Sequence, residues 1–306
     1  MAWFNRTGFR MAVLLLLLLV PTGCNIDHHV QKTIKIDDPK ASESEEQFRG
    51  LIINFFQLPD GESALVRLPN GKTMLIDTGS EKDAPTIVKE LAARKITRID
   101  YVVITNDLPN HAGGYGQLAK ALQIDSVLLP KLTAYTIKHA VPLGDVKQIH
   151  LLAAGDTLTL DQGISLFVLN PTDNLHLAPQ DNSLVFQLTH KKMHFLFTSG
   201  IGQTAEEQLL IRYKEHLPSE ILKVGEQGSN QSTSQPFLQA VDPQVAVIQT
   251  GKSLSDIKND EAETLERLHE SWTETYLTSQ NGTITIFSSG DDYRVKRDKK
   301  GKGTRE

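Results

Sequence analysis

Polar side chains gather in four loops, and each loop follows a segment with the composition of a buried strand. The loops are residues 75–79, 105–114, 198–202 and 223–229. They carry carboxylates at Asp77, Asp107 and Glu226 and an imidazole at His111. Carboxylates and imidazole transfer protons and bind cations, so these loops predict acid–base chemistry, cation binding or recognition of a polar ligand.

Short β-prone runs and amphipathic helices alternate between residues 50 and 288. Strands are expected at 51–57, 64–68, 73–77, 101–105, 126–129, 183–188, 193–198, 221–224, 245–249 and 283–287, within a chain that is also strand-rich at 148–171. Helices are expected at 84–95, 115–122, 205–213 and 261–269. Strands in two groups, with helices after each group, predict an α/β fold, a four-layer αββα sandwich. Loops that follow its buried strands can aim side chains into one site.

Three tight turns are expected to join neighbouring strands. Residues 69–71 read Pro-Asn-Gly and residues 281–282 read Asn-Gly, a sequence that tolerates positive φ and favours hairpins. Residues 190–192, His-Lys-Lys, separate the third pair of strands. We therefore expect a hairpin at each of these turns.

The four loops, in this order and spacing, resemble the metallo-β-lactamase superfamily. The resemblance is strongest to the hydrolase-like carboxyl domain of ComEC-type competence DNA-uptake proteins. Residues 61–63, Gly-Glu-Ser, resemble the opening Gly-Asp-Ser of that domain, and residues 181–183 resemble its Asp-Asn-Ser segment. Residues 245–248 and 265–268 resemble its last strand and helix. The resemblance covers about residues 50–287 and implies the αββα sandwich.

The metal loop of that family reads Thr-His-x-His-x-Asp-His-x-Gly-Gly, and residues 105–114 depart from it. Asn106 and Leu108 stand at the first two histidines, and Asn110 stands at the aspartate. His111 and the two glycines match the family pattern. The resemblance therefore leaves His111 as the one family ligand in this loop.

Two further ligand positions of the family are also substituted. The metal-bridging aspartate, in a Thr-Gly-Asp turn, falls on Gly200. The later His-His pair falls on Glu226 and Gln227, and the competence-type histidine near Lys258 is missing. A catalytic zinc needs about three protein ligands and one open position. Without zinc, nothing in the loop lowers the pKa of a water from near 16 towards about 7. We therefore expect no cofactor.

Two interpretations of the polar groups stay open. In the first, they are remnants on a solvated rim, with Asp77 bonding backbone amides of neighbouring turns. In the second, the cleft is reused for a glycan, a nucleotide or an oxygen-bound Mg²⁺ or Ca²⁺. Asp77, Asp107 and His111 are the candidate catalytic residues, without assigned roles.

The amino terminus has the pattern of a secretory signal. Arg6 and Arg10 precede the apolar run 11–20, which is too short for the roughly 20 residues of a membrane span. The run ends before Cys24, the only cysteine, as in a bacterial lipobox, although Pro21 replaces the usual aliphatic residue. We expect residues 1–23 to be removed and Cys24 to be lipidated on the outer side of the cell membrane. The alternatives are an uncleaved anchor and a buried core cysteine.

Both ends of the chain are expected to lie outside the folded domain. Residues 24–49 are polar and predict a flexible stalk, which leaves residues 50–288 for the metallo-β-lactamase-like domain. Residues 289–306 are expected to form a disordered tail, and residues 293–306 have seven Lys and Arg against two acids. The tail is expected to be merely solvated. A weaker alternative is electrostatic contact with anionic lipid, cell-wall polymer or nucleic acid.

Composition narrows the function classes. The chain has 306 residues, 39% hydrophobic residues and a formal net charge of −5, which argues against a disordered chain and against a globally basic nucleic-acid binder. We expect a lipid-anchored, extracytoplasmic protein of the ComEC-like type that has lost its metal centre, a pseudoenzyme. It would act by binding an envelope partner, a glycan or extracellular DNA.

Two other functions compete with this one. One is a metal-dependent hydrolase, phosphodiesterase-like or nuclease-like, that uses zinc or another divalent metal held by His111, Asp77 and substitute ligands. The other is a non-enzymatic, membrane-proximal module that makes contact through its basic tail.

Overall fold

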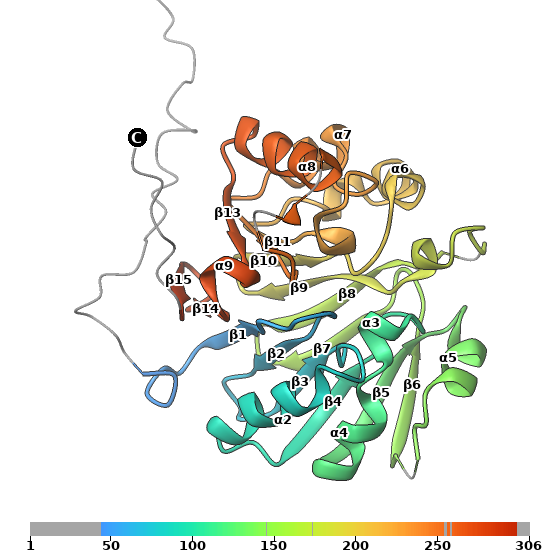
Figure 1. Ribbon diagram of the computed structural model, residues 1–306, viewed down its shortest axis with the longest axis vertical. Coiled ribbons are helices and arrows are strands. Elements are labelled where there is room, and N and C mark those ends of the chain that lie inside the picture. The colour runs from blue at the N-terminus through green and yellow to red at the C-terminus, as the bar shows by residue number, and fades with distance from the viewer. Residues whose placement is uncertain (1–43, 145, 173, 254–255, 258, 299–306) are drawn as a thin grey trace, which may run out of the picture. The chain divides into compact units, whose positions relative to one another are not determined.

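Two β-sheets lie face to face, and helices cover both outer faces (Figure 1). The structure is a computed structural model that describes residues 44–298 except residues 145, 173, 254, 255 and 258. The four layers confirm the predicted αββα sandwich, and the loops expected to carry chemistry follow strands of both sheets.

The first sheet has eight strands in the order β15-β14-β1-β2-β3-β4-β5-β6. Their bounds are β1 Leu51–Phe55, β2 Ala64–Arg67, β3 Thr73–Ile76, β4 Arg98–Val103, β5 Gln123–Pro130, β6 Gln148–Leu152, β14 Ile284–Ser288 and β15 Tyr293–Arg297. Strands β3 to β6 run parallel, whereas the others pair antiparallel. The carboxyl ends of β3 and β4 therefore meet at one edge.

The second sheet has seven strands in the order β13-β12-β11-β10-β9-β8-β7. Their bounds are β7 Thr157–Asp161, β8 Ile164–Asn170, β9 Val185–His190, β10 Met193–Phe197, β11 Ile221–Lys223, β12 Val245–Ile248 and β13 Glu274–Leu277. Strands β10 to β13 are parallel, so the loops after β10 and β11 leave the sheet at the same edge.

The helices form the outer layers. Their bounds are α2 Ala84–Ala93, α3 Pro109–Ala112, α4 Tyr115–Ala121, α5 Ala134–Ala140, α6 Gln203–Arg212, α7 Gln235–Val241, α8 Asn259–Glu270 and α9 Thr278–Asn281, with short 3₁₀ turns η1 Pro179–Asn182, η2 Lys214–His216 and η3 Gly225–Gly228. Helices α2, α4 and α5 cover the first sheet, and α6, α7 and α8 cover the second (Figure 1).

Three apolar cores result from the alternation of side chains along the strands. Met74 and Ile76 of β3 point into the core between the sheets, while Leu75 points to the helices. In β10, Phe195 and Phe197 likewise face the other sheet, whereas Leu196 packs under α6 and α7. This packing holds the two sheets rigidly, so the loops at their shared edge have a fixed geometry.

Two of the three expected hairpins are present. β2 pairs with β3 around residues 69–71, and β9 pairs with β10 around residues 190–192. The hairpin expected at 281–282 was wrong, because β13 lies in the second sheet whereas β14 pairs with β1 and β15 in the first. Asn281 is the last residue of the short helix α9, and Gly282 follows it where the chain passes from one sheet to the other.

The expected flexible stalk (24–49) ends earlier than predicted, because its last residues pack on the domain. Glu45 forms an ion pair with Arg67. The rings of Phe48 and Phe287 meet edge to face with centroids 5.2 Å apart. Both contacts join residues that are far apart in the sequence. The local pattern of residues 24–49, which shows no hydrophobic period, therefore did not predict them.

The expected disordered tail (289–306) begins with a strand, so the prediction was wrong for 293–297. β15 pairs antiparallel with β14, and the side chains of Tyr293 and Val295 are buried. The high positive charge concealed a period-two alternation of apolar and basic side chains. Residues 299–306 lie outside the described residues.

Residues 1–43, with the expected signal and Cys24, also lie outside the described residues. Within residues 44–298, no helix has both the length and the hydropathy that a bilayer crossing requires.

Truncation after Asp292 should destabilise the domain, because it removes β15. Tyr293 and Val295 are 6% and 2% exposed, and burial of such side chains contributes about 1.5–3 kcal/mol each. We expect the free energy of unfolding, measured in urea, to fall by about 3–5 kcal/mol. A truncation after Asp298 is the matched control and should leave it unchanged. Equal stability of the two truncated chains would contradict the assignment of β15 to the domain.

Candidate functional site

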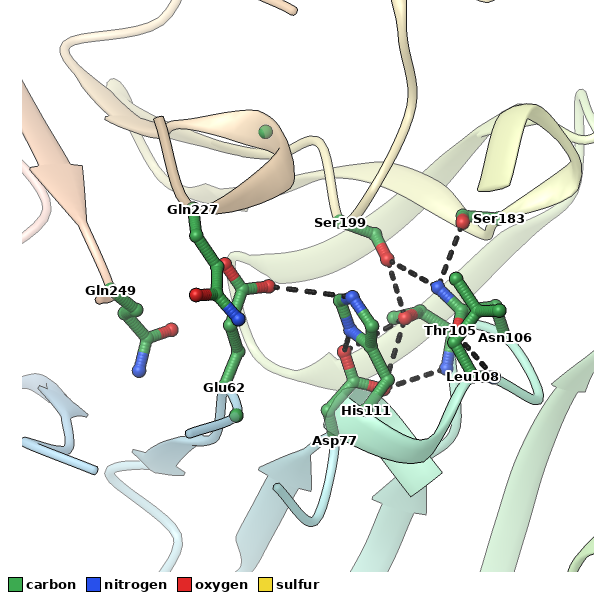
Figure 2. Close-up of polar contacts among 12 residues, drawn as sticks. Glu62, Asp77, Thr105, Asn106, Leu108, His111, Ser183, Ser199, Gln227 and Gln249 are labelled. Carbon is green, nitrogen blue, oxygen red and sulfur yellow. Dashed lines mark hydrogen bonds and ion pairs between the residues drawn. The ribbon is translucent and has the colours of Figure 1, made fainter. Parts of the chain in front are cut away.

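Loops from both sheets meet at the edge where the parallel strands end. Asp77 follows β3, His111 lies on α3 after β4, and Ser199 and Gly200 follow β10. Lys223 is the last residue of β11. Figure 2 shows the side chains of Asp77, His111 and Ser199 pointing toward one another from the two sheets.

Asp77 is the centre of a buried hydrogen-bond network. The carboxylate accepts the backbone N–H of Thr105 at 2.8 Å and the Thr105 hydroxyl at 2.8 Å. It also lies 2.8 Å from Nδ1 of His111. Asp77 is 4% exposed and has φ 56°, a conformation that the bonds to its side chain stabilise. The bond from the Thr105 N–H agrees with the interpretation of Asp77 as a backbone-bonding residue, but the solvated rim was wrong, because Asp77, Asn106 and His111 are buried.

His111 is held as a donor to Asp77, so its Nε2 faces the cleft. Nε2 lies 3.7 Å from Oε2 of Glu62. Burial lowers the pKa of His111, but the charge of Asp77, the hydrogen bond to it and the charge of Glu62 outweigh burial and raise that pKa above its ordinary value. The imidazole thus tends towards the charged form that the two carboxylates favour.

A second buried charge pair joins the two sheets. Nζ of Lys223 donates to Oε2 of Glu62 at 2.5 Å and to the carbonyl of Ser199 at 3.1 Å. The side chains of Glu62 and Lys223 are 2% and 5% exposed. Buried ions are costly unless they are paired, so this pair fixes the loop after β1 against the end of β11.

Asp83 fixes the turn that precedes Glu62. The buried Asp83 carboxylate accepts the backbone N–H groups of Gly61 at 2.6 Å, Ser80 at 2.9 Å and Asp60 at 3.2 Å. These three bonds hold the turn before Glu62 in one conformation. A Cβ at Gly61 would lie 2.3 Å from the carbonyl of Asn110, so only glycine fits there.

Asn106 takes part in structural hydrogen bonds. Its amide nitrogen donates to the hydroxyl of Ser183 at 2.9 Å, and its oxygen accepts the N–H of Leu108 at 2.9 Å. The Ser199 hydroxyl lies 2.5 Å from the Thr105 hydroxyl. Because Thr105 gives its proton to Asp77, Ser199 is the donor in that contact.

Gly200 and Asn110 stand at two other substituted ligand positions of the family. A Cβ at Gly200 would lie 3.5 Å from Nε2 of His111, so a side chain at this position would enter the cleft. Asn110 contributes its carbonyl, which accepts the N–H of Glu62 at 3.0 Å. The side chains of Asn110 and Asp107 make no hydrogen bond among the described residues, and Asp107 is not part of the network.

Glu226 is half-buried on η3. It has φ 43° and the next residue, Gln227, has φ 55°, two left-handed residues in succession. Burial raises the pKa of Glu226, and repulsion from Asp181 and Glu62 raises it further. The Gln227 amide donates to the carbonyl of Asp60 at 2.9 Å and thereby ties η3 to the first sheet.

The residues present do not fit a zinc centre. Leu108 offers no lone pair, the amide of Asn106 is engaged with Ser183, and Gly200 has no side chain. In the part of the chain that the structure describes, no group of three or more His, Cys, Asp and Glu side chains is arranged to hold a metal ion.

The floor of the cleft is nearly closed. A cavity of about 10 Å³ lies among Glu62, Asp77, Ser199, Lys223 and Gln249. This volume is close to the minimum that one water molecule requires, so any larger ligand has to bind nearer the rim.

Sequence reasoning missed Glu62 and Lys223 as site residues. Both are charged residues at the ends of buried, apolar segments, and this position was the available signal. Gly61-Glu62-Ser63 was used for its resemblance alone. Ser199 and Thr105 also take part in the network, but hydroxyl residues of this kind are too common for sequence to single out.

Comparison with known proteins agrees with this geometry. Residues 60–252 match the sequence profile of the metallo-beta-lactamase superfamily. The chain belongs to this superfamily. Its αββα sandwich is similar to the metallo-beta-lactamase fold protein YhfI from Bacillus subtilis, with a TM-score of 0.52, 11% identity and coverage of 74% of this chain and 96% of that one.

Within the superfamily, the chain is similar in sequence to parts of longer proteins, one of them named as a competence protein. The chain is 24% identical to ComE operon protein 3 of Bacillus subtilis, over 76% of this chain and 32% of that protein. It is 29% identical to competence protein ComA of Neisseria gonorrhoeae, over 62% of this chain and 26% of that protein. These matches support a ComEC-like metallo-β-lactamase-fold protein that spans less than a third of the length of either relative.

Asp77→Asn should destabilise the domain, because the amide cannot accept all the bonds that Asp77 accepts and removes the charge at Nδ1 of His111. We expect the free energy of unfolding to fall by about 2–4 kcal/mol. Asp107→Asn is the matched control, since Asp107 is half-buried and outside the network, and it should change stability by less than about 0.5 kcal/mol. Urea unfolding measures both. Similar losses in the two variants would show that the network does not stabilise the site.

Proposed function

We propose that this chain is a lipid-anchored, extracytoplasmic metallo-β-lactamase-fold protein of the ComEC-like type that has lost its metal centre and acts by binding. The proposal is supported mainly by the residues that stand at the metal-ligand positions of the family. Asn106 is committed to Ser183, Leu108 is apolar and Gly200 has no side chain. The scaffold around these positions is intact, so the fold has been kept without the groups that hold zinc.

The groups that are present support binding better than hydrolysis. His111 and Asp77 form a buried pair, and Glu62 is neutralised by Lys223. Without a metal, no group in this cleft lowers the pKa of a bound water towards neutrality. The half-buried carboxylate of Glu226 remains available for a polar ligand.

The charge of the cleft disfavours DNA as its ligand. Asp77, Glu62, Asp181 and Glu226 supply four carboxylates, whereas Lys223 and His111 supply the nearby positive charge. A phosphate backbone is attracted by basic surfaces and repelled by acidic ones. We therefore favour an envelope partner or a glycan over extracellular DNA. This chain covers less than a third of either relative, so the activity of the whole relatives does not decide its ligand.

Elemental analysis of the purified protein, expressed in metal-replete medium, tests the proposal. We expect zinc far below one ion per chain, no change of melting temperature with added chelator, and no hydrolysis of a generic phosphodiester with added Mn²⁺ or Zn²⁺. Near-stoichiometric zinc would overturn the proposal. Turnover that vanishes in His111→Ala would instead favour the metal-dependent hydrolase.

The anchor has a separate test. Arg6 and Arg10, the apolar run 11–20 and Cys24 support export and lipidation. In a bacterial host, the protein should fractionate with membranes, and Cys24→Ser should remain an uncleaved precursor of higher mass, because a lipoprotein signal is removed after lipidation of the cysteine. Wild-type and variant chains of equal mass, neither of them lipid-modified, would exclude the anchor.

A further inference from the structure

Strand β6 forms one edge of the first sheet (Figure 1). Among the described residues, it pairs with β5 alone. The carbonyl of Leu152 accepts the N–H of Lys131 at 2.7 Å, so the backbone groups of Leu152 point towards β5. Because the direction of these groups alternates along a strand, the N–H and C=O of Ile149 and Leu151 point away from β5. The outer side of β6 therefore offers donors and acceptors to a further strand.

The side chains of the same two residues are exposed. In the parallel register, Ile149 lies beside Val127 of β5, and both side chains point to the helix side of the sheet. Leu151 lies in the same way beside Leu129. The two residues of β5 are buried, whereas Ile149 and Leu151 are 39% and 43% exposed and belong to none of the three apolar cores. The edge thus combines unpaired backbone groups with apolar side chains.

The other described sheet edges are protected in ways that β6 is not. β15 carries three basic residues, and β7 has an irregular register between Thr159 and Asp161. β13 has four residues and begins with Glu274. Charges, bulges and short length keep edge strands from pairing with another chain. Residues 148–152, Gln-Ile-His-Leu-Leu, form a regular strand without Lys, Arg, Asp or Glu, so β6 is the edge that is open to pairing.

The carboxyl-terminal residues 299–306 are too few to cover this edge. The described chain ends just after β15, which is the opposite edge of the same sheet. β15 and β6 are seven strand positions apart, about 34 Å at about 4.8 Å per strand. Eight extended residues span at most about 29 Å. This tail therefore cannot reach β6 and also pair along it.

We propose that β6 pairs antiparallel with β6 of a second copy of this chain, so that the first sheets of the two copies join into one. With the two-fold axis at His150, Ile149 lies opposite the partner's Leu151, and Leu151 lies opposite the partner's Ile149. Two residues that face each other in this way exchange both of their N–H···O=C bonds, so the outward groups of both strands are satisfied. The inference is independent of whether the cleft binds a metal.

Charge and symmetry favour a second copy over a different protein. The strand has no charged side chain of the kind that keeps an edge apart from its own copy. Lys147, which precedes it, is held by its own chain, with Nζ 2.9 Å from Oδ1 of Asp125. Apolar side chains meet apolar side chains across the axis, which stabilises a strand pair. The surface is thus complementary to itself, as a two-fold interface requires.

The mass of the purified full-length protein in solution tests the proposal. By sedimentation equilibrium we expect mostly dimer at about 100 µM, since a pair of short strands is a small interface and implies a dissociation constant of about tens of micromolar. Hydrogen exchange at the amides of Ile149 and Leu151 should be slow at that concentration and faster on dilution. A monomer at about 100 µM overturns the proposal. Exchange that is slow in a monomer also overturns it, because another segment of the same chain then covers β6.

Two double variants test the antiparallel register. Ile149→Lys with Leu151→Lys places like charges opposite each other across the axis and should weaken dimerisation at least about tenfold. Ile149→Lys with Leu151→Glu has as many charges, but each introduced lysine faces an introduced glutamate. It should therefore dimerise at least about tenfold more tightly than the first variant. Equal affinities of the two double variants would overturn the proposed pairing.

Ile211→Lys is the matched control, because Ile211 is an exposed apolar residue on α6, which covers the other sheet. It should dimerise within about twofold of the wild-type chain. All these chains have the same amino terminus, so association through a lipid anchor would be equal in all of them. Equal dimerisation of the wild-type chain and the double-lysine variant would exclude β6 as the interface. The exchange measurement needs no substitution and stands even where a variant unfolds.

Discussion

Two buried carboxylates, Glu62 and Asp77, determine how the rest of the cleft is built. A buried ion costs several kcal/mol unless positive charge and hydrogen bonds surround it. The chain supplies that charge from its own side chains, His111 for Asp77 and Lys223 for Glu62. Lys223 comes from the second sheet, 161 residues further along the chain than Glu62. The Glu62–Lys223 pair thus links the two halves of the sandwich through side chains alone.

The neutral residues around these charged groups form a second hydrogen-bond network. Asn106 bridges Ser183 and Leu108, and Ser199 donates to Thr105, which in turn donates to Asp77. Each of these groups has its hydrogen bonds satisfied within the chain. A polar group that is satisfied in this way gains little from leaving its partners for a metal. A metal-binding side chain introduced at Asn106 alone would therefore break existing hydrogen bonds before it created a metal site.

Much of the fold was predictable from sequence, but the site was predictable only in part. The apolar strands and the loops after them are local patterns, so residues 73–77, 101–105 and 221–224 were placed correctly as strands. The Glu62–Lys223 pair joins distant segments, and nothing local encodes it. The Asn-Gly turn at 281–282 has the local chemistry of a hairpin, but tertiary packing sends the strands on either side to different sheets. The charge of residues 293–297 concealed a strand for the same reason, since pairing with β14 outweighs composition.

The sign of the charge in the cleft matters more for function than the likeness of the fold. The cores between and outside the sheets are apolar and do not involve the charged residues of the cleft. Unit charges about 4 Å apart at an effective dielectric of about 20 interact by about 4 kcal/mol. A metal centre brings positive charge that attracts phosphate, whereas Glu226, Asp181 and Glu62 bring negative charge that repels it. The charge of the cleft therefore bears on the class of ligand that can bind, which is why the function of a relative cannot be transferred to this chain by fold alone.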